Sequence, residues 1–149
     1  MAAYKRVLVG TDGSESSMLA VERAASLAAG ADATLLIACA YVPADPRAIG
    51  QASDQLGEDA YQIQGDNPAA EIVRRARERA QAQGASRFEE HAVEGAPVES
   101  LLSLAKRENV ELLVVGNKGI NSLAGRLLGS VPAESARKAE CDVLIVHTV

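Results

Sequence analysis

A glycine-bearing segment between a buried strand and a helix constrains this 149-residue chain more than any other feature. Residues 111–115 (E-L-L-V-V) form a short apolar run that predicts a buried strand. Segment 116–129 follows with four glycines, and Ser130, with Pro132 close behind it, signals the start of a helix. Glycines let backbone N–H groups approach a phosphate, and a helix N-terminus adds unpaired donors and partial positive charge. We therefore expect a nucleotide-binding site here.

The rest of the chain alternates between strand and helix patterns. The predicted strands are residues 4–9, 33–42, 87–93, 111–115 and 142–147, and the predicted helices are residues 14–29, 68–83, 97–109 and 130–138. Such alternation predicts a parallel sheet with right-handed crossovers and helices on both faces. We expect one α/β domain over residues 1–149, with no repeat.

Local signals refine the first two helices. Asp12 and Glu15 fit a capping box before the first helix, and Gly30 fits its C-terminal stop. The second helix carries four arginines within residues 74–79, interleaved with glutamates. We interpret these arginines as a solvated face and not as an anion site.

Residues 43–66 interrupt this rhythm, because they are polar, contain several prolines and glycines, and have no sustained period. A connection of this length inside one domain is typically functional or mobile. Two interpretations stay open: a lid over a ligand, or a partly ordered surface loop.

Composition excludes several classes of protein. The net charge is −5, with no basic block, and one Phe, three Tyr and no Trp leave few stacking platforms, so nucleic acid is not an expected partner. The longest apolar run, residues 35–42, is too short to span a membrane, and no secretory signal is visible, which predicts a cytoplasmic protein. Cys39 and Cys141 lack metal or redox spacing and are expected to be buried free thiols.

Three segments together resemble one known family. Gly116, Gly119 and Gly129 followed by Ser130 match the G-x2-G-x9-G-[ST] pattern of the nucleotide-binding branch of the universal stress protein family. The segments 7–14 (V-L-V-G-T-D-G-S) and 141–146 (C-D-V-L-I-V) are similar to the first and last strands of that family. The resemblance covers nearly the whole chain. It implies a Rossmann-like three-layer sandwich with a five-stranded parallel sheet of order 3-2-1-4-5.

In that order the first and fourth strands are neighbours, so residues 10–12 and 116–119 meet at one edge of the sheet, at the switch point where such folds bind ligands. The resemblance implies that Gly10, Thr11 and Asp12 face the adenosine of a nucleotide. The Asp12 carboxylate suits hydrogen bonds from ribose hydroxyls or the base. The backbone of Ala40 would read the adenine edge.

The remaining implied site residues lie around the glycine pattern. Val115 and Gly116 would lie against the nucleoside. The phosphate side would be lined by Asn117, Lys118, Gly119, Gly129, Ser130 and Val131. Simpler roles stay open: Asp12 and Ser130 could be helix caps only, and Lys118 and Arg126 could point into solvent.

The ligand implied by the resemblance is an adenine nucleotide, with no obligatory cofactor. The segments G-N-K-G and A-G-R-L-L-G-S-V-P look closest to the branch that binds cyclic AMP, so we expect cyclic AMP, with ATP bound more weakly and Mg²⁺ possible only with ATP. The protein would act as a sensor of the nucleotide or as a sink for it.

We expect a carrier and not an enzyme. Related pyrophosphatases have an S-G-G-x-D-S loop after the first strand, where this chain has T-D-G-S-E-S. No catalytic or metal-binding residues are predicted, and His91 and His147 are expected in edge strands away from the cleft. The alternatives are an ATP-binding stress protein with slow ATP hydrolysis and a dimeric interaction module that needs no nucleotide.

An apolar final strand, residues 143–146 (V-L-I-V), is expected at an edge of the sheet, where such a strand is normally covered or paired. We therefore expect a homodimer through this strand, which the family resemblance also implies.

Overall fold

The computed structural model describes residues 3–42, 68–117 and 130–148. In chain order its elements are β1 (Arg6–Gly10), α1 (Glu15–Ala31), β2 (Thr34–Tyr41), α4 (Pro68–Ala82), β3 (Phe88–Glu94), α5 (Pro97–Arg107), β4 (Leu112–Gly116), α6 (Ser130–Lys138) and β5 (Asp142–Val146). The five strands form one sheet in the order β3-β2-β1-β4-β5, and every neighbouring pair is parallel. The expected α/β fold and strand order are confirmed.

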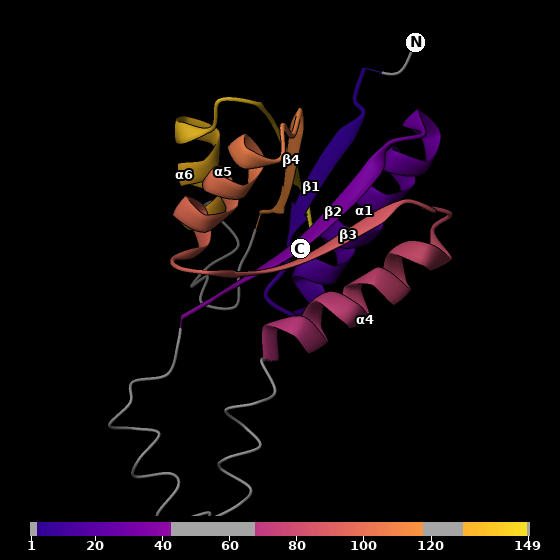
Figure 1. The fold of residues 1–149 in the computed structure, drawn as a ribbon, viewed down its shortest axis with the longest axis horizontal. Coiled ribbons are helices and arrows are strands. Elements are labelled where there is room, and N and C mark those ends of the chain that lie inside the picture. The colour runs from indigo at the N-terminus through magenta and orange to yellow at the C-terminus, as the bar shows by residue number, and fades with distance from the viewer. Residues whose placement is uncertain (1–2, 43–67, 118–129, 149) are drawn as a thin grey trace, which may run out of the picture.

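Helices cover both faces of the sheet: α1 and α4 pack on one face, and α5 and α6 on the other (Figure 1). Successive strand residues point to opposite faces, so the aliphatic strands feed two cores. In β1, Val7 and Val9 belong to the core under α1 and α4, while Leu8 belongs to the core under α5. Continuous burial explains why these strands are apolar throughout instead of alternating with polar residues.

The core under α1 and α4 is built from small residues. Apart from Met18, its buried helix positions are alanines and valines: Ala20, Val21, Ala24, Ala25 and Ala28 of α1, and Ala69, Val73, Ala76 and Ala80 of α4. Short side chains let the two helices pack closely against each other and against the sheet. The alanine-rich composition therefore serves the packing of this layer.

Both predicted end signals of α1 are wrong. The N-cap is Ser14, whose Oγ accepts a hydrogen bond from the Ser17 backbone N at 3.1 Å. The helix runs through Gly30 to Ala31 and ends at Asp32, which has a φ of 55°. The short polar side chain of Asp tolerates this left-handed conformation, so Asp32 ends the helix in place of the glycine that the sequence suggested.

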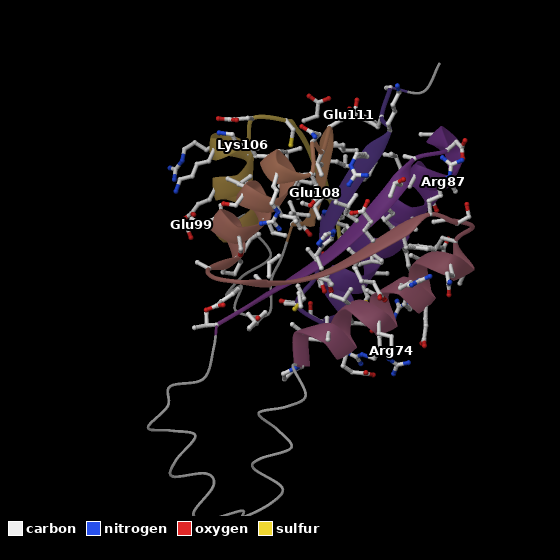
Figure 2. All side chains as sticks on the ribbon, in the orientation of Figure 1. Arg74, Arg87, Glu99, Lys106, Glu108 and Glu111 are labelled. Atoms are coloured by element: carbon white, nitrogen blue, oxygen red, sulfur yellow. The ribbon has the colours of Figure 1, made fainter. Side chains whose placement is uncertain are left out.

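Arg74 and Arg79 of α4 pair with carboxylates. Arg74, on the outer side of α4 (Figure 2), pairs with Glu71 at 2.6 Å and Glu78 at 3.3 Å. Arg79 reaches across to α1, where it pairs with Glu15 at 3.0 Å and Glu22 at 2.9 Å. The hydrogen bond from Arg79 lowers the pKa of the Glu15 carboxyl. The contacts of Arg74 support a solvated face, while Arg79 also links α4 to the first turn of α1.

Candidate functional site

The carboxyl ends of β1, β2 and β4 lie side by side. Val9 of β1 pairs with Val114 of β4, and Gly10 of β1 pairs with Ala38 of β2. The parallel register therefore brings the residues after β1 and the residues after β4 to one edge. Two motifs about 100 positions apart in sequence meet at the switch point of the sheet, where ligands bind in open α/β folds.

The turn after β1 is held by its own side chains. Thr11 is buried, and its backbone N donates to the Ala38 carbonyl oxygen at 2.9 Å. The Thr11 hydroxyl lies 2.7 Å from Ser17 Oγ and accepts a hydrogen bond from the Gly13 backbone N at 3.1 Å. The Thr11 side chain therefore shapes the turn from inside, and its Ser17 partner was not predicted from the sequence.

Asp12 is exposed at this edge, and its Oδ1 accepts a hydrogen bond from the Ser14 backbone N at 2.9 Å. The carboxylate thus supports the turn before α1, but the helix cap itself belongs to Ser14. A carboxylate oxygen can accept more than one hydrogen bond, so this contact is compatible with a ligand hydroxyl on the same group.

The structure explains why two positions of this turn are glycines. A Cβ atom at Gly10 would lie 2.8 Å from Leu101 Cδ1, so α5 packs directly on the end of β1. Gly13 has a φ of +87°, and a Cβ there would lie 3.1 Å from Ile72 and 3.5 Å from Arg75 Nη2. The first turns of α4 therefore lie against the turn after β1.

The end of β2 lies close enough to Asp12 for the Asp12 charge to affect the pKa of the Cys39 thiol. Cys39 is buried, and burial raises the pKa of its thiol, with a further rise from the negative charge of Asp12. Ala40 follows, half-buried, in register with Val93 of β3. The structure thus places Ala40 at the same edge as the predicted adenosine-facing residues.

After β4, the chain turns toward its own C-terminal end. Val115 is buried in the core under α5, and the Asn117 backbone N donates to the Val146 carbonyl oxygen at 2.9 Å. Asn117 Oδ1 accepts hydrogen bonds from Thr148 N and Thr148 Oγ1, each at 2.9 Å. The Asn117 side chain is therefore engaged with the segment after β5, and its predicted place beside a phosphate stays a prediction.

His147 lies one residue after β5, beside the segment that follows β4. Its Nδ1 lies 3.3 Å from Asn117 Nδ2, next to a predicted site residue. The Asn117 amide nitrogen can only donate, so His147 Nδ1 is the acceptor of this hydrogen bond. The parallel pairing of β4 with β5 explains the contact, because it brings the residues that follow both strands to the same edge. His91, in contrast, pairs with Glu89 on the edge strand β3.

Part of the predicted site lies outside the described residues: Lys118, Gly119, Gly129, Arg126 and the whole of segment 43–66. Ser130 begins α6, as predicted, and Val131 packs against the core under α5. The described half of the site therefore consists of the turn after β1, the end of β2 and the first residues after β4.

Two features are absent from the described ranges. Across residues 3–42, 68–117 and 130–148, no three His, Cys, Asp or Glu side chains are grouped so as to hold a metal ion. Within the same ranges, no helix has the length and apolar character needed to cross a membrane.

The chain is similar to several known proteins along nearly its whole length. The chain is 55% identical over 148 residues to Universal stress protein Rv1636 of Mycobacterium tuberculosis strain H37Rv, covering 99% of each chain. A crystal structure of that protein superposes with a TM-score of 0.61 at 50% identity, covering 100% of this chain and 99% of the other.

A crystal structure of a universal stress protein in complex with cAMP is also similar. It has a TM-score of 0.76 at 48% identity, covering 99% of this chain and 100% of that one. Universal stress protein UspA from Lactobacillus plantarum, with 21% identity and a TM-score of 0.77 over 99% of this chain and all of its own, shares the fold.

The sequence model described as the universal stress protein family matches residues 3–147. That match includes β1, the glycine-bearing segment and β5, the three segments that carried the resemblance. By its sequence, its strand order and these relatives, the chain belongs to the universal stress protein family.

Proposed function

We propose that this protein binds cyclic AMP at the carboxyl edge of its sheet and acts as a nucleotide sensor or sink. One observation carries the proposal: β1 and β4 are adjacent and parallel, so the Asp12 turn and the start of the glycine pattern share one edge. A relative that is 48% identical over nearly the full chain was crystallised with cAMP, which supports this choice of ligand.

The predicted site residues fall into two groups, one that binds the nucleoside and one that binds the phosphate. The Asp12 carboxylate, exposed beside Gly10 and Thr11, accepts hydrogen bonds from the nucleoside, and the backbone of Ala40 meets the base edge. Val115 and Gly116 lie against the nucleoside. The phosphate falls to Asn117, Lys118, Gly119, Gly129, Ser130 and Val131, whose backbone N–H groups include those at the start of α6.

A cyclic monophosphate suits this chain better than a triphosphate. It carries a single negative charge, and Lys118 and Arg126 are the only cations within the glycine pattern. A triphosphate needs more positive charge or Mg²⁺ to be held as tightly. We therefore rank ATP second and assign the protein a carrier role without catalysis. Slow ATP hydrolysis and a nucleotide-independent dimeric module are the alternatives.

Calorimetric titration of the purified protein with cyclic AMP and with ATP tests the ranking. We expect cyclic AMP to bind more tightly. Asp12→Asn keeps an oxygen for the Ser14 backbone N but removes the charge, and should weaken cyclic AMP binding by roughly tenfold or more, since hydrogen bonds to charged groups are worth about 1.5–3 kcal/mol.

The matched control is Asp142→Asn, the same change at the opposite end of the sheet, where Asp142 accepts a hydrogen bond from Tyr4. Cyclic AMP affinity should be unaffected by it. Tighter binding of ATP than of cyclic AMP would reverse the ranking of ligands, and equal effects of the two substitutions would remove Asp12 from the site.

The homodimer through β5 is also part of the proposal. β5 is an edge strand of the described sheet, and Val143, Leu144 and Ile145 are each only partly buried in the single chain. A row of half-covered aliphatic side chains on an unpaired edge favours pairing with a second copy. A cytoplasmic location stays a prediction from the sequence.

A further inference from the structure

Thr148, just after β5, joins two segments that flank the proposed site. Its backbone N and its Oγ1 both lie 2.9 Å from Asn117 Oδ1, and its Oγ1 lies 2.5 Å from Ser16 Oγ in the first turn of α1. The Thr148 hydroxyl has one proton, which it donates to Asn117, so the Ser16 hydroxyl donates to Thr148. A directed chain of hydrogen bonds therefore runs from Ser16 through Thr148 to Asn117.

The same side chain fills the space beside the first glycine of the pattern. A Cβ atom at Gly116 would lie 3.4 Å from Thr148 Cγ2 and 3.6 Å from Thr148 Oγ1, with Ala20 of α1 next at 3.8 Å. An alanine at position 116 would make ordinary contact, whereas a larger residue would displace Thr148. The Thr148 side chain thus lies between Gly116 and α1.

Few other described contacts hold Asn117. Its backbone N donates to Val146, which extends the β4 and β5 pairing by one residue, and its side-chain amide contacts His147 at an exposed position. The two hydrogen bonds from Thr148 are partly buried, and one of them connects onward to α1. Thr148 therefore supplies a hydrogen-bonded link between the start of the glycine pattern and the helix layer.

We propose that Thr148 is a positioning residue for the nucleotide site: its hydroxyl fixes Gly116 and Asn117 in place before the ligand arrives. The inference rests on the proposed function, because it assumes that these two residues meet a nucleotide. A pre-ordered backbone binds more tightly, since less conformational entropy is lost on binding. The C-terminal residues after β5 thereby take part in binding without touching the ligand.

The test uses Thr148→Val in the full-length protein. Valine has nearly the same shape, keeps a methyl group against Gly116 and keeps the backbone donor to Asn117, but it cannot connect Asn117 to Ser16. Cyclic AMP affinity measured by calorimetry should fall by roughly three- to tenfold, the range expected for one net hydrogen bond. Thr148→Ser, which retains the hydroxyl, should restore affinity to within about twofold of the wild type.

A matched control and a cycle separate positioning from general damage. Thr34→Val makes the same change at the start of β2, at the opposite end of the sheet, and should leave affinity unaltered. Ser16→Ala breaks the same chain of hydrogen bonds at its other end. The double variant of Ser16→Ala and Thr148→Val should therefore bind about as weakly as either single variant, because coupled residues are not additive.

Hydrogen exchange in the nucleotide-free protein gives a readout that does not depend on binding. Thr148→Val should speed exchange at the Asn117 amide and leave that of Val114, within β4, unchanged. Unchanged affinity in Thr148→Val, or additive losses in the double variant, would overturn the inference while leaving the proposed function intact. A wild-type protein that binds no cyclic AMP would overturn both.

Discussion

At the scale of single residues, Gly13 shows how a turn can limit substitution without touching a ligand. Its φ of +87° lies in the left-handed region, and the space that a side chain would occupy is lined by Ile72 and Arg75. Gly30, in contrast, lies within the helical backbone of α1, and a Cβ atom there would have nothing within 4 Å. The two glycines therefore predict opposite responses to the same change.

Gly13→Ala should lower the free energy of unfolding by about 1–2 kcal/mol, the cost of left-handed backbone in a residue with a side chain. Gly30→Ala should raise it by about 0.5–1 kcal/mol, because alanine loses less entropy than glycine on entering a helix. Urea unfolding followed by circular dichroism measures both. A Gly13→Ala variant as stable as the wild type would contradict the strained turn.

The two cysteines differ in exposure, and this predicts their reactivity. Cys39 is buried and Cys141 is partly exposed, and burial raises the pKa of both thiols, so neither is extensively ionised at neutral pH. Iodoacetamide should alkylate Cys141 slowly and Cys39 more slowly still, with both reacting fast in urea. Mass spectrometry of the labelled peptides checks the order, and faster labelling of Cys39 in the folded protein would contradict its burial.

At the scale of elements, ion pairs connect β1, β3 and the end of α5 at the amino end of the sheet. Arg6 of β1 pairs with Glu89 of β3 at 2.9 Å and with Glu108, at the end of α5, at 3.3 Å. Glu108 and the neighbouring Glu111 are marked in Figure 2. Burial alone would raise the pKa of Glu89, but hydrogen bonds from His91 and Arg6 outweigh it and lower that pKa.

This direction sets how Glu89 responds to acid. Because its pKa is lower in the folded protein than in the unfolded chain, the ionised carboxylate stabilises the fold fully above the unfolded value and loses that effect as the pH falls through the folded value. Glu89→Gln should be less stable than the wild type by about 0.5 kcal/mol at pH 7, a value reduced by solvent screening. The difference should be smaller at a pH of about 3, below the ordinary pKa of a glutamate, and should close as the pH falls through the folded value.

Urea unfolding of both proteins at the two pH values measures this change. Glu78→Gln, at an exposed partner of Arg74 on α4, serves as the control and should differ from the wild type by less than about 0.5 kcal/mol at both. A Glu89→Gln deficit that persisted in acid would show that packing, and not charge, accounts for it.

The β5 edge carries a prediction about assembly. Light scattering at micromolar concentration should give the mass of a dimer for the wild type. Leu144→Lys, which places a charge in the middle of the half-covered edge, should give a monomer with an unchanged circular dichroism spectrum. A monomeric wild type would contradict the dimer, and a dimeric lysine variant would place the interface elsewhere.

At the scale of the whole molecule, local sequence patterns predict which elements form and roughly where. Continuous aliphatic runs mark the buried strands, and Pro68 and Pro97 mark the first residues of α4 and α5. The strand order follows from the family resemblance, because periodicity alone does not say which strands are neighbours. These predictions rest on local patterns or on a family resemblance, and the structure confirms them.

The features that the sequence does not predict depend on contacts between distant residues or on competing local signals. Asp12 offers as good a capping signal as Ser14, and the Ser14 cap accepts from a backbone N–H that any residue except proline at position 17 would supply. The pairing of Thr148 with Asn117 has no signal at all, since the two are 31 positions apart and meet only because β4 and β5 are parallel neighbours. Side-chain networks of this kind follow from the assembled fold.

In the proposed complex, one adenine nucleotide lies across the carboxyl ends of β1, β2 and β4. The most direct measurement is nuclear magnetic resonance of the labelled protein during titration with cyclic AMP. We expect the amide signals of Gly10, Asp12, Ala40 and Gly116 to shift together, while those of Arg87 and Asp142 at the amino end of the sheet stay in place. Shifts confined to the amino end, or none at saturating nucleotide, would contradict this placement of the nucleotide.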